Sequence, residues 1–168
     1  MSSENQKETR KRFTQSISSA VFIEDVEGKL LLLKQNKQKG GKWGPPSGGV
    51  EYGEDPAATA EREANEEANL QVELVSLIGI YPVKRGENYY SGIGFVYRAR
   101  LKDQTNIKID GEEIVDARYF KKEEVKKLIQ DNQIYKPEYN ESCIADWLDG
   151  KNYQLDVVKP IIDAEKLY

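Results

Sequence analysis

One segment constrains this chain more than any other: a helix-forming stretch, residues 55–69, whose two sides differ in chemistry. Asp55 is a favourable N-cap, and Pro56 suits the first helical position, where its missing N–H leaves no hydrogen bond unmade. Asn69 is expected to end the helix, because asparagine tolerates the left-handed backbone that closes many helices. One side is a stripe of small residues, Ala57, Ala60, Ala64 and Ala68. Such a stripe lets a helix lie close against a sheet.

The neighbouring side of the same helix is acidic. Glu63, Glu66 and Glu67 stand at i, i+3 and i+4, which makes them neighbours on one helix face. Their mutual repulsion weakens the helix unless a counter-charge offsets it, and a hard divalent cation is the obvious candidate. The loop at 45–54 is rich in glycine, which permits close approach of backbone to a ligand. Together these features favour a metal site over the alternative, a solvated charge-rich helix.

Composition restricts the chemistry further. The chain has 168 residues and no histidine, which excludes Ser-His-Asp and Cys-His mechanisms and every imidazole metal site. A general base must then be a carboxylate or, less favourably, a lysine or tyrosine. The one cysteine, Cys143, cannot form an intramolecular disulfide or a Cys-rich zinc site, so a reducing cytosol is the expected compartment. A net charge of −4 is not that of a basic nucleic-acid-binding domain, and no nucleic acid partner is expected.

The length predicts one domain, with a flexible N-terminal tail over residues 1–15 and a single domain over 16–168. No apolar stretch approaches the roughly 20 residues that span a bilayer, and the polar N-terminus lacks the apolar core of a signal peptide. We therefore expect a cytoplasmic protein without a membrane partner.

The order of elements predicts an α/β (α+β) fold, a mixed sheet covered by helices rather than a doubly wound array. Strands are expected at 16–24, 29–33, 72–83, 89–101 and 117–120, the first two forming a hairpin. Residues 34–49 read as a long loop. Besides the acidic helix, helices are expected at 121–130 and at 140–149, the latter capped by Asn140.

Residues 48–70 resemble the signature box of the Nudix hydrolases, G-x5-E-x7-R-E-U-x-E-E-x-G-U, where U is aliphatic. Seven of the nine specified positions match, including every charged one. Ala64 is smaller than the usual aliphatic residue, and Asn69 replaces the last glycine. Since asparagine adopts the same left-handed cap, a modest stability cost and intact chemistry are expected. The resemblance implies an α/β/α sandwich.

The resemblance also implies a reaction: hydrolysis of a nucleoside diphosphate linked to a group X, by attack of metal-activated water on phosphorus. Mg²⁺ suits such an all-oxygen site, with Mn²⁺ as a substitute. Carried over by position in the box, the metal ligands are the carbonyl of Gly48 and the carboxylates of Glu63, Glu66 and Glu67. Arg62 and Glu54 are expected to form an ion pair that orients these carboxylates. The expected catalytic residues within the box are Arg62, Glu66 and Glu67.

Outside the box, the family often has another acid ahead of a short aromatic strand. Glu113, in the loop before 117–120, resembles it and is expected to be a further metal ligand or the general base, with Glu112 as second choice and a solvated loop as the alternative. Substrate contacts are expected from a base-stacking aromatic or a phosphate-binding cation, each with packing or solvent exposure as its alternative: Trp43, Lys42, Tyr89 and Arg98.

Three functions are weighed. The first is a metal-dependent pyrophosphohydrolase acting on a nucleoside triphosphate, ADP-ribose or a nucleotide sugar, or a dinucleoside polyphosphate. The second is a non-catalytic nucleotide sensor, whose signature would be lost acids, whereas here they are complete. The third is a prenyl diphosphate isomerase, which typically uses an active-site cysteine, and Cys143 lies far from the box. Pro82 and Tyr89 give conflicting cues to the substrate. A homodimer is common in the family and is expected as a partner.

Overall fold

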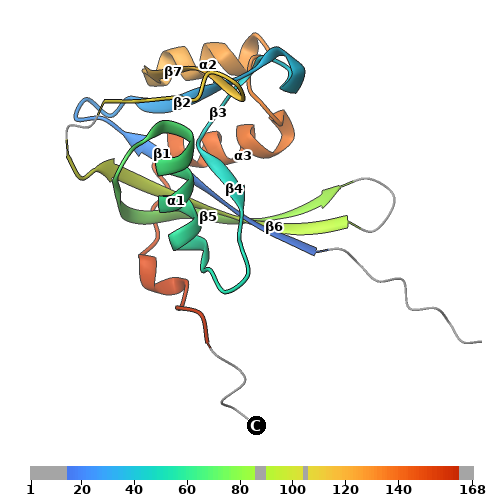
Figure 1. Ribbon diagram of the computed structural model, residues 1–168, viewed down its shortest axis with the longest axis vertical. Coiled ribbons are helices and arrows are strands. Elements are labelled where there is room, and N and C mark those ends of the chain that lie inside the picture. Colours follow the sequence, from blue (N-terminus) through green and yellow to red (C-terminus); the bar gives the residue numbers. More distant parts are fainter. Residues whose placement is uncertain (1–14, 86–89, 104–105, 163–168) are drawn as a thin grey trace, which may run out of the picture.

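The computed structural model describes residues 15–85, 90–103 and 106–162, and its centre is one mixed sheet (Figure 1). The predicted tail and Tyr89 lie outside the described residues. The strands are β1 (Gln15–Glu24), β2 (Leu30–Gln35), β3 (Trp43–Gly44), β4 (Ser47–Gly49), β5 (Val72–Arg85), β6 (Tyr90–Leu101) and β7 (Ile114–Phe120). The helices are α1 (Pro56–Ala68), α2 (Lys122–Gln130) and α3 (Pro137–Leu148), with short 3₁₀ turns η1 (Lys37–Lys39) and η2 (Leu155–Val157).

The sheet has seven strands, with the main order β3-β2-β1-β6-β5. β1 runs parallel to β6, and the other pairs are antiparallel; β4 pairs with β1 and β7 pairs with β2. The predicted hairpin of β1 and β2 is confirmed. The segment predicted as a loop at 34–49 contains β3 and β4, which are only two and three residues long and too short for a pattern to reveal.

Helices cover both faces of this sheet, as Figure 1 shows. The strand β1 contributes to two cores because consecutive residues point to opposite faces. Val21 and Ile23 pack with the alanines of α1, whereas Ala20 and Phe22 pack with Trp147 and other residues of α2 and α3. All four are at most 2% exposed. The predicted fold class, a mixed sheet flanked by helices, is confirmed.

The prediction for the last helix is wrong at its start. α3 begins at Pro137, three residues before Asn140, and its N-cap residue is Lys136 in the left-handed conformation with φ of +47°. Asn140 is instead inside the helix, where its side-chain amide donates to the carbonyl of Tyr135. Pro137 fits the first helical position for the same reason as Pro56. None of the helices among the described residues is long and apolar enough to cross a membrane.

Candidate active site

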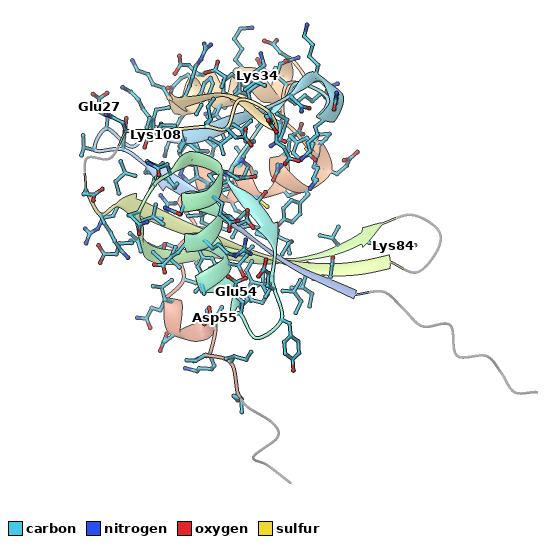
Figure 2. The ribbon with its side chains drawn as sticks, in the orientation of Figure 1. Glu27, Lys34, Glu54, Asp55, Lys84 and Lys108 are labelled. Carbon is cyan, nitrogen blue, oxygen red and sulfur yellow. The ribbon has the colours of Figure 1, made fainter. Side chains whose placement is uncertain are left out.

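The acidic helix α1 begins and ends as its sequence predicts. Asp55 Oδ1 accepts the Ala58 N–H at 2.9 Å, and Asn69 takes the left-handed conformation with φ of +56°, its N–H bonding carbonyls of the last turn. Figure 2 shows Glu54 and Asp55 at the N-terminal end of this helix. The alanine stripe is confirmed as the buried side, since Ala60, Ala64 and Ala68 are fully buried against the sheet. The helix is thus fixed close to β1 and β4, and the acidic side is left facing the loop before it.

Gly48 lies against the carboxylate of Glu63. A Cβ added at Gly48 would overlap the carboxyl carbon and oxygens of that side chain, whereas Gly49 has open space at the same position. Gly48 is held in place by β4, which pairs with β1 through Ser19. Only a residue without a side chain allows the backbone to approach a carboxylate so closely. This contact places the backbone of Gly48 next to the Glu63 carboxylate of α1.

Arg62 donates hydrogen bonds to three of the acidic side chains at once. Its Nε and Nη2 donate to the two carboxyl oxygens of Glu54 at 2.9 and 3.0 Å, and Nη1 donates to Glu63 at 2.7 Å and Glu66 at 2.9 Å. Nη2 also donates to the Gly49 carbonyl at 2.9 Å. These bonds use all five N–H donors of the guanidinium. The predicted pairing of Arg62 with Glu54 is present, and the same guanidinium also orients two of the predicted metal ligands.

Glu54 is the most strongly stabilised anion of the group. Hydrogen bonds from Arg62, helped by the Thr59 hydroxyl and the Glu51 N–H, lower the pKa of its carboxyl to about 2. Glu54 therefore stays ionised at any physiological pH. With every Glu54 oxygen engaged, its role is to hold Arg62 rather than to meet a ligand.

Glu67 has the opposite environment. Burial raises the pKa of its carboxyl to about 7, although the Ser47 N–H donates to Oε2 at 3.0 Å and opposes the shift. The negative charges of Glu63 and Glu113 raise it further, and Lys39 lowers it. Burial also raises the pKa of Glu63, against the opposing effect of Arg62. The inner part of the acidic face thus holds negative charge that the described residues do not fully compensate.

Glu113 reaches this face from another part of the chain. It lies in the loop before β7 and pairs with Lys39, whose Nζ is 2.6 Å from Glu113 Oε2. Since both charges affect the pKa of Glu67, the structure brings the predicted Glu113 within electrostatic range of the box. Glu112 instead offers its backbone carbonyl to the Asn36 side chain. Nothing in the sequence sets Lys39 apart from the other lysines of the segment 34–42.

These side chains suit a hard cation. Carboxylate and carbonyl oxygens are the ligands that Mg²⁺ prefers. Glu63, Glu66 and Glu67 each keep one carboxyl oxygen that accepts no hydrogen bond from the described part of the chain. Within that same part, no three acidic side chains already converge in a metal-binding arrangement, because Arg62 draws Glu63 and Glu66 to itself. The donor set therefore fits a divalent ion, and Arg62 is its internal competitor for two of the ligands.

Trp43 and Arg98, two of the expected substrate contacts, are engaged with other side chains of the protein. Trp43 is 6% exposed and packs edge-on against Phe120, with ring centroids 4.8 Å apart. Arg98 lies on the α3 face of the sheet, where Nη1 donates to both carboxyl oxygens of Glu24. The Trp147 indole N–H also donates to Glu24. The position of Trp43 favours the packing alternative over a substrate contact. Arg98, paired with Glu24 and 18% exposed, fits neither a substrate contact nor the alternative of a solvated sheet face.

The remaining candidates are less constrained. Lys42 Nζ donates to the Asn132 side chain at 2.8 Å, at the surface near η1. Cys143 is fully buried, and burial raises the pKa of its thiol to about 12, so it is an unreactive core residue. That environment argues against the isomerase reading, which relies on a reactive cysteine.

A cavity of 210 Å³ adjoins Gly48 on the α3 side of the sheet, and sequence reasoning missed it. β1 and β4 contribute its serines, and the start of α3 contributes Lys136, Tyr139 and Asn140. The nearby Gly94 has no Cβ that would overlap the Tyr139 ring, so this tyrosine can lie on the sheet. A sequence signal existed: Ser16 and Ser18 alternate with Ile17, and Ser19 extends the polar first half of a strand whose second half is mostly apolar. A polar face on an apolar strand marks a solvated or ligand-facing position.

Comparisons with known proteins agree with this geometry. The NUDIX domain family matches residues 14–140, so the chain belongs to the Nudix hydrolase family. Members of this family are pyrophosphohydrolases that act on nucleotides and typically depend on divalent metal ions. The resemblance drawn from residues 48–70 is confirmed.

The individual relatives share less than half of their aligned residues with this chain. The chain is 29% identical over 136 residues to a human diphosphoinositol polyphosphate phosphohydrolase, covering 79% of this chain and 71% of that protein. It is 43% identical to an octanoyltransferase from Myxococcus xanthus over only 51 residues, 30% of this chain and 14% of that enzyme's length. The structure is similar to a Nudix hydrolase from Nitrosomonas europaea, with a TM-score of 0.73, 26% identity, and coverage of 88% and 98% of the two chains.

Proposed function

We propose that this protein is a Mg²⁺-dependent pyrophosphohydrolase that cleaves a nucleoside diphosphate linked to another group. The observation that carries the proposal is the acidic face of α1, where the partly buried Glu67 carboxyl accepts the Ser47 N–H but bonds no cation among the described residues. Burial raises its pKa to about 7. A divalent ion would neutralise that charge. The proposed ligands are the Gly48 carbonyl and the carboxylates of Glu63, Glu66 and Glu67. Mn²⁺ would substitute for Mg²⁺.

The chain's own residues would act as follows. Arg62 and Glu54 keep the acidic side chains oriented and hold Gly49 against the helix. Glu113 accepts the proton from the attacking water. Lys39 places a positive charge beside the phosphates. The bound metal would supply charge neutralisation at the phosphate oxygens and acidify a water molecule. Products would be two phosphates or phosphate esters from one pyrophosphate.

The cavity of 210 Å³ beside Gly48 supports a polar organic group next to the proposed phosphate site, and its volume suits part of a nucleotide. It opens within reach of the proposed phosphate site and offers hydroxyl, amide and ammonium groups, from Ser18, Ser47, Asn140 and Lys136. We propose that the organic part of the substrate enters here. Nucleoside triphosphates, ADP-ribose or nucleotide sugars, and dinucleoside polyphosphates all contain the required pyrophosphate. A cytoplasmic location and a homodimer stay predictions.

The test is a substrate panel followed by phosphorus NMR, with and without Mg²⁺, using the full chain. The panel includes these three classes and a diphosphoinositol polyphosphate, because one relative carries that name. Running the reaction in ¹⁸O-labelled water identifies the phosphorus that is attacked. The matched control is Glu61→Gln, an exposed acid on the same helix, against Glu67→Gln. Metal-dependent cleavage lost only in Glu67→Gln supports the proposal. Tight nucleotide binding without any product would support the sensor module instead.

A further inference from the structure

Two loops meet beside the acidic face of α1, and one side chain joins them. The first loop, residues 36–41, contains η1. The second, residues 110–113, precedes β7. The Nδ2 of Asn36 donates to the Glu112 carbonyl at 2.7 Å, while its Oδ1 accepts the Lys39 N–H at 2.9 Å. Its own backbone N–H donates to the Glu113 carbonyl at 2.9 Å. Asn36 is therefore bonded to both loops at once.

Each loop carries one charged side chain, and the two charges meet. Lys39 Nζ and Glu113 Oε2 are 2.6 Å apart. The pair is more than one-third exposed on both sides, at 41% and 63%, so its own attraction is weak. Such a pair does not hold two loops in register by itself. The backbone pairing of β2 with β7, which ends at Gln35 and Ile114, brings the two loops together, and the hydrogen bonds of Asn36 extend this contact toward residues 39 and 113.

The second loop is also stabilised by hydrogen bonds of its own, but these bonds do not reach the first loop. Asp110 Oδ1 accepts the N–H groups of Glu112, Glu113 and Ile114 at 2.9 to 3.2 Å. Apart from the Lys39–Glu113 pair, the amide of Asn36 makes the side-chain hydrogen bond between the two loops in the described part of the chain. A residue that served only to cap η1 would need the Oδ1 acceptor alone. The Nδ2 donor is explained by the contact with the second loop.

We propose that Asn36 is a positioning residue, which fixes the Lys39–Glu113 pair beside Glu67 so that both charges face the reacting phosphates. This inference rests on the proposed function, because it assigns Glu113 and Lys39 their places in that reaction. Asn36 itself touches neither substrate nor metal. It acts through the two charged residues, and its effect must disappear when they are removed.

The experiment compares Asn36→Ala, which loses both side-chain bonds, with Asn36→Ser, which keeps a cap acceptor for η1 and loses the donor to Glu112. The control is Gln38→Ala, an exposed amide on the same turn. We expect kcat to fall about tenfold or more in both Asn36 variants with KM changed less than about threefold, and no change in the control. A kcat in Asn36→Ser equal to that of the wild type would overturn the proposal, because the cap alone would then be sufficient.

A double-mutant cycle separates positioning from general destabilisation. In a Glu113→Gln background, adding Asn36→Ala is expected to lower kcat by less than about twofold, because the group that it positions is already lost. Effects that simply multiply would contradict the proposal. The thermal midpoints of all variants are compared to show that the folded fraction is the same.

A second readout needs no turnover and distinguishes failure of this inference from failure of the proposed function. Amide hydrogen exchange is measured by NMR on the metal-free protein at residues 36 and 39, whose N–H groups bond the Glu113 carbonyl and Asn36 itself. Asn36→Ala is expected to speed both exchanges about tenfold or more while β1 is unaffected. Unchanged exchange overturns the positioning role even if the enzyme hydrolyses nucleotides. Faster exchange in Asn36→Ala, combined with a wild type that cleaves nothing on the panel, would overturn only the proposed function.

Discussion

Glu54 and Glu67 lie one helix length apart around the same box, yet their carboxyl groups have opposite electrostatic surroundings. Arg62 and two further donors lower the pKa of Glu54 to about 2, whereas burial raises that of Glu67 to about 7. One end of the acidic face is thus neutralised by the chain itself. The other end is left with charge for a ligand to neutralise. The difference shows that Arg62 compensates Glu54, Glu63 and Glu66, whereas Glu67 accepts only the Ser47 N–H among the described residues.

Removing the uncompensated charge should have the largest effect. Glu67→Gln keeps size and the bond from Ser47 but loses the proposed metal ligand, so kcat is expected to fall on the order of 10³-fold. The measurement is steady-state hydrolysis of the best panel substrate at saturating Mg²⁺. The same substitution at Glu61 should leave kcat within about twofold. A Glu67→Gln enzyme with wild-type turnover would remove this residue from the site.

Removing the guanidinium of Arg62 tests the acids that this cation compensates. Arg62→Ala leaves Glu54, Glu63 and Glu66 without their shared partner, and we expect about 1–3 kcal/mol lower stability and roughly 100-fold lower kcat. Urea unfolding and kinetics on the same preparation give both numbers. Arg100→Ala breaks an exposed pair with Glu73 and is the control, with an expected loss under about 1 kcal/mol. Equal losses in the two variants would mean that Arg62 is only a surface residue.

The close approach of Gly48 to Glu63 can be tested with one methyl group. Gly48→Ala must displace the Glu63 carboxylate, whereas the same change at Gly49 enters open space. We expect kcat to fall about 10- to 100-fold in the first variant and to stay within about twofold in the second. Wild-type kinetics in Gly48→Ala would show that the Glu63 position tolerates displacement.

The raised pKa of Glu67 predicts how stability depends on pH without metal. Its folded-state pKa of about 7 exceeds its ordinary value of 4.5, so the folded state binds the proton more tightly between these values. The contribution of Glu67 is therefore fully present below pH 4.5 and is lost as pH rises through 7. The difference in unfolding free energy between wild type and Glu67→Gln should change by roughly 2 kcal/mol from pH 4.5 to 8. Saturating Mg²⁺ should abolish the loss at pH 8, and a pH-independent difference would refute this view of Glu67.

The smallest effect is expected at the end of α1. Asn69 has a φ of +56°, which glycine adopts with less strain. Asn69→Gly should therefore stabilise the protein by about 0.5–1 kcal/mol in thermal unfolding, with kcat unchanged. A loss of activity would mean that the asparagine side chain has a role beyond closing the helix.

Local signals made most of the fold and the box predictable. The ends of α1 follow from Asp55, Pro56 and Asn69, since capping depends on residues adjacent in sequence. The pairing of Arg62 with Glu54 was predicted from the resemblance to the signature box, and the structure contains it. The start of α3 was missed because Asn140 is the residue type that usually caps a helix, whereas the observed N-cap, Lys136, has no capping side-chain bond; Pro137 was the local signal for the true start.

The rest of the site depends on contacts between distant segments. Trp43 and Arg98 carry side chains suited to bind a nucleotide, but Phe120 and Glu24, from other strands, place them in structural contacts. The cavity beside Gly48 arises where β1 meets α3, more than 100 residues apart in the chain. Two of the three bonds of Asn36 likewise reach a loop more than 70 residues away. A pattern of residue types in the sequence does not predict which distant segments come into contact.

The central place of β1 also has a consequence for the route by which the protein folds. β1 pairs with β6 in parallel over residues separated by 76 positions, as for Gln15 and Ser91. Closing so long a segment of chain is slow, since its entropy must be lost before any pairing energy is gained. The segments that bring Gly48 to Glu63 are β1, β4 and α1, which all lie within residues 15–68. Their contacts close a much shorter segment of chain, so the acidic box can assemble before the β1–β6 pairing completes the sheet.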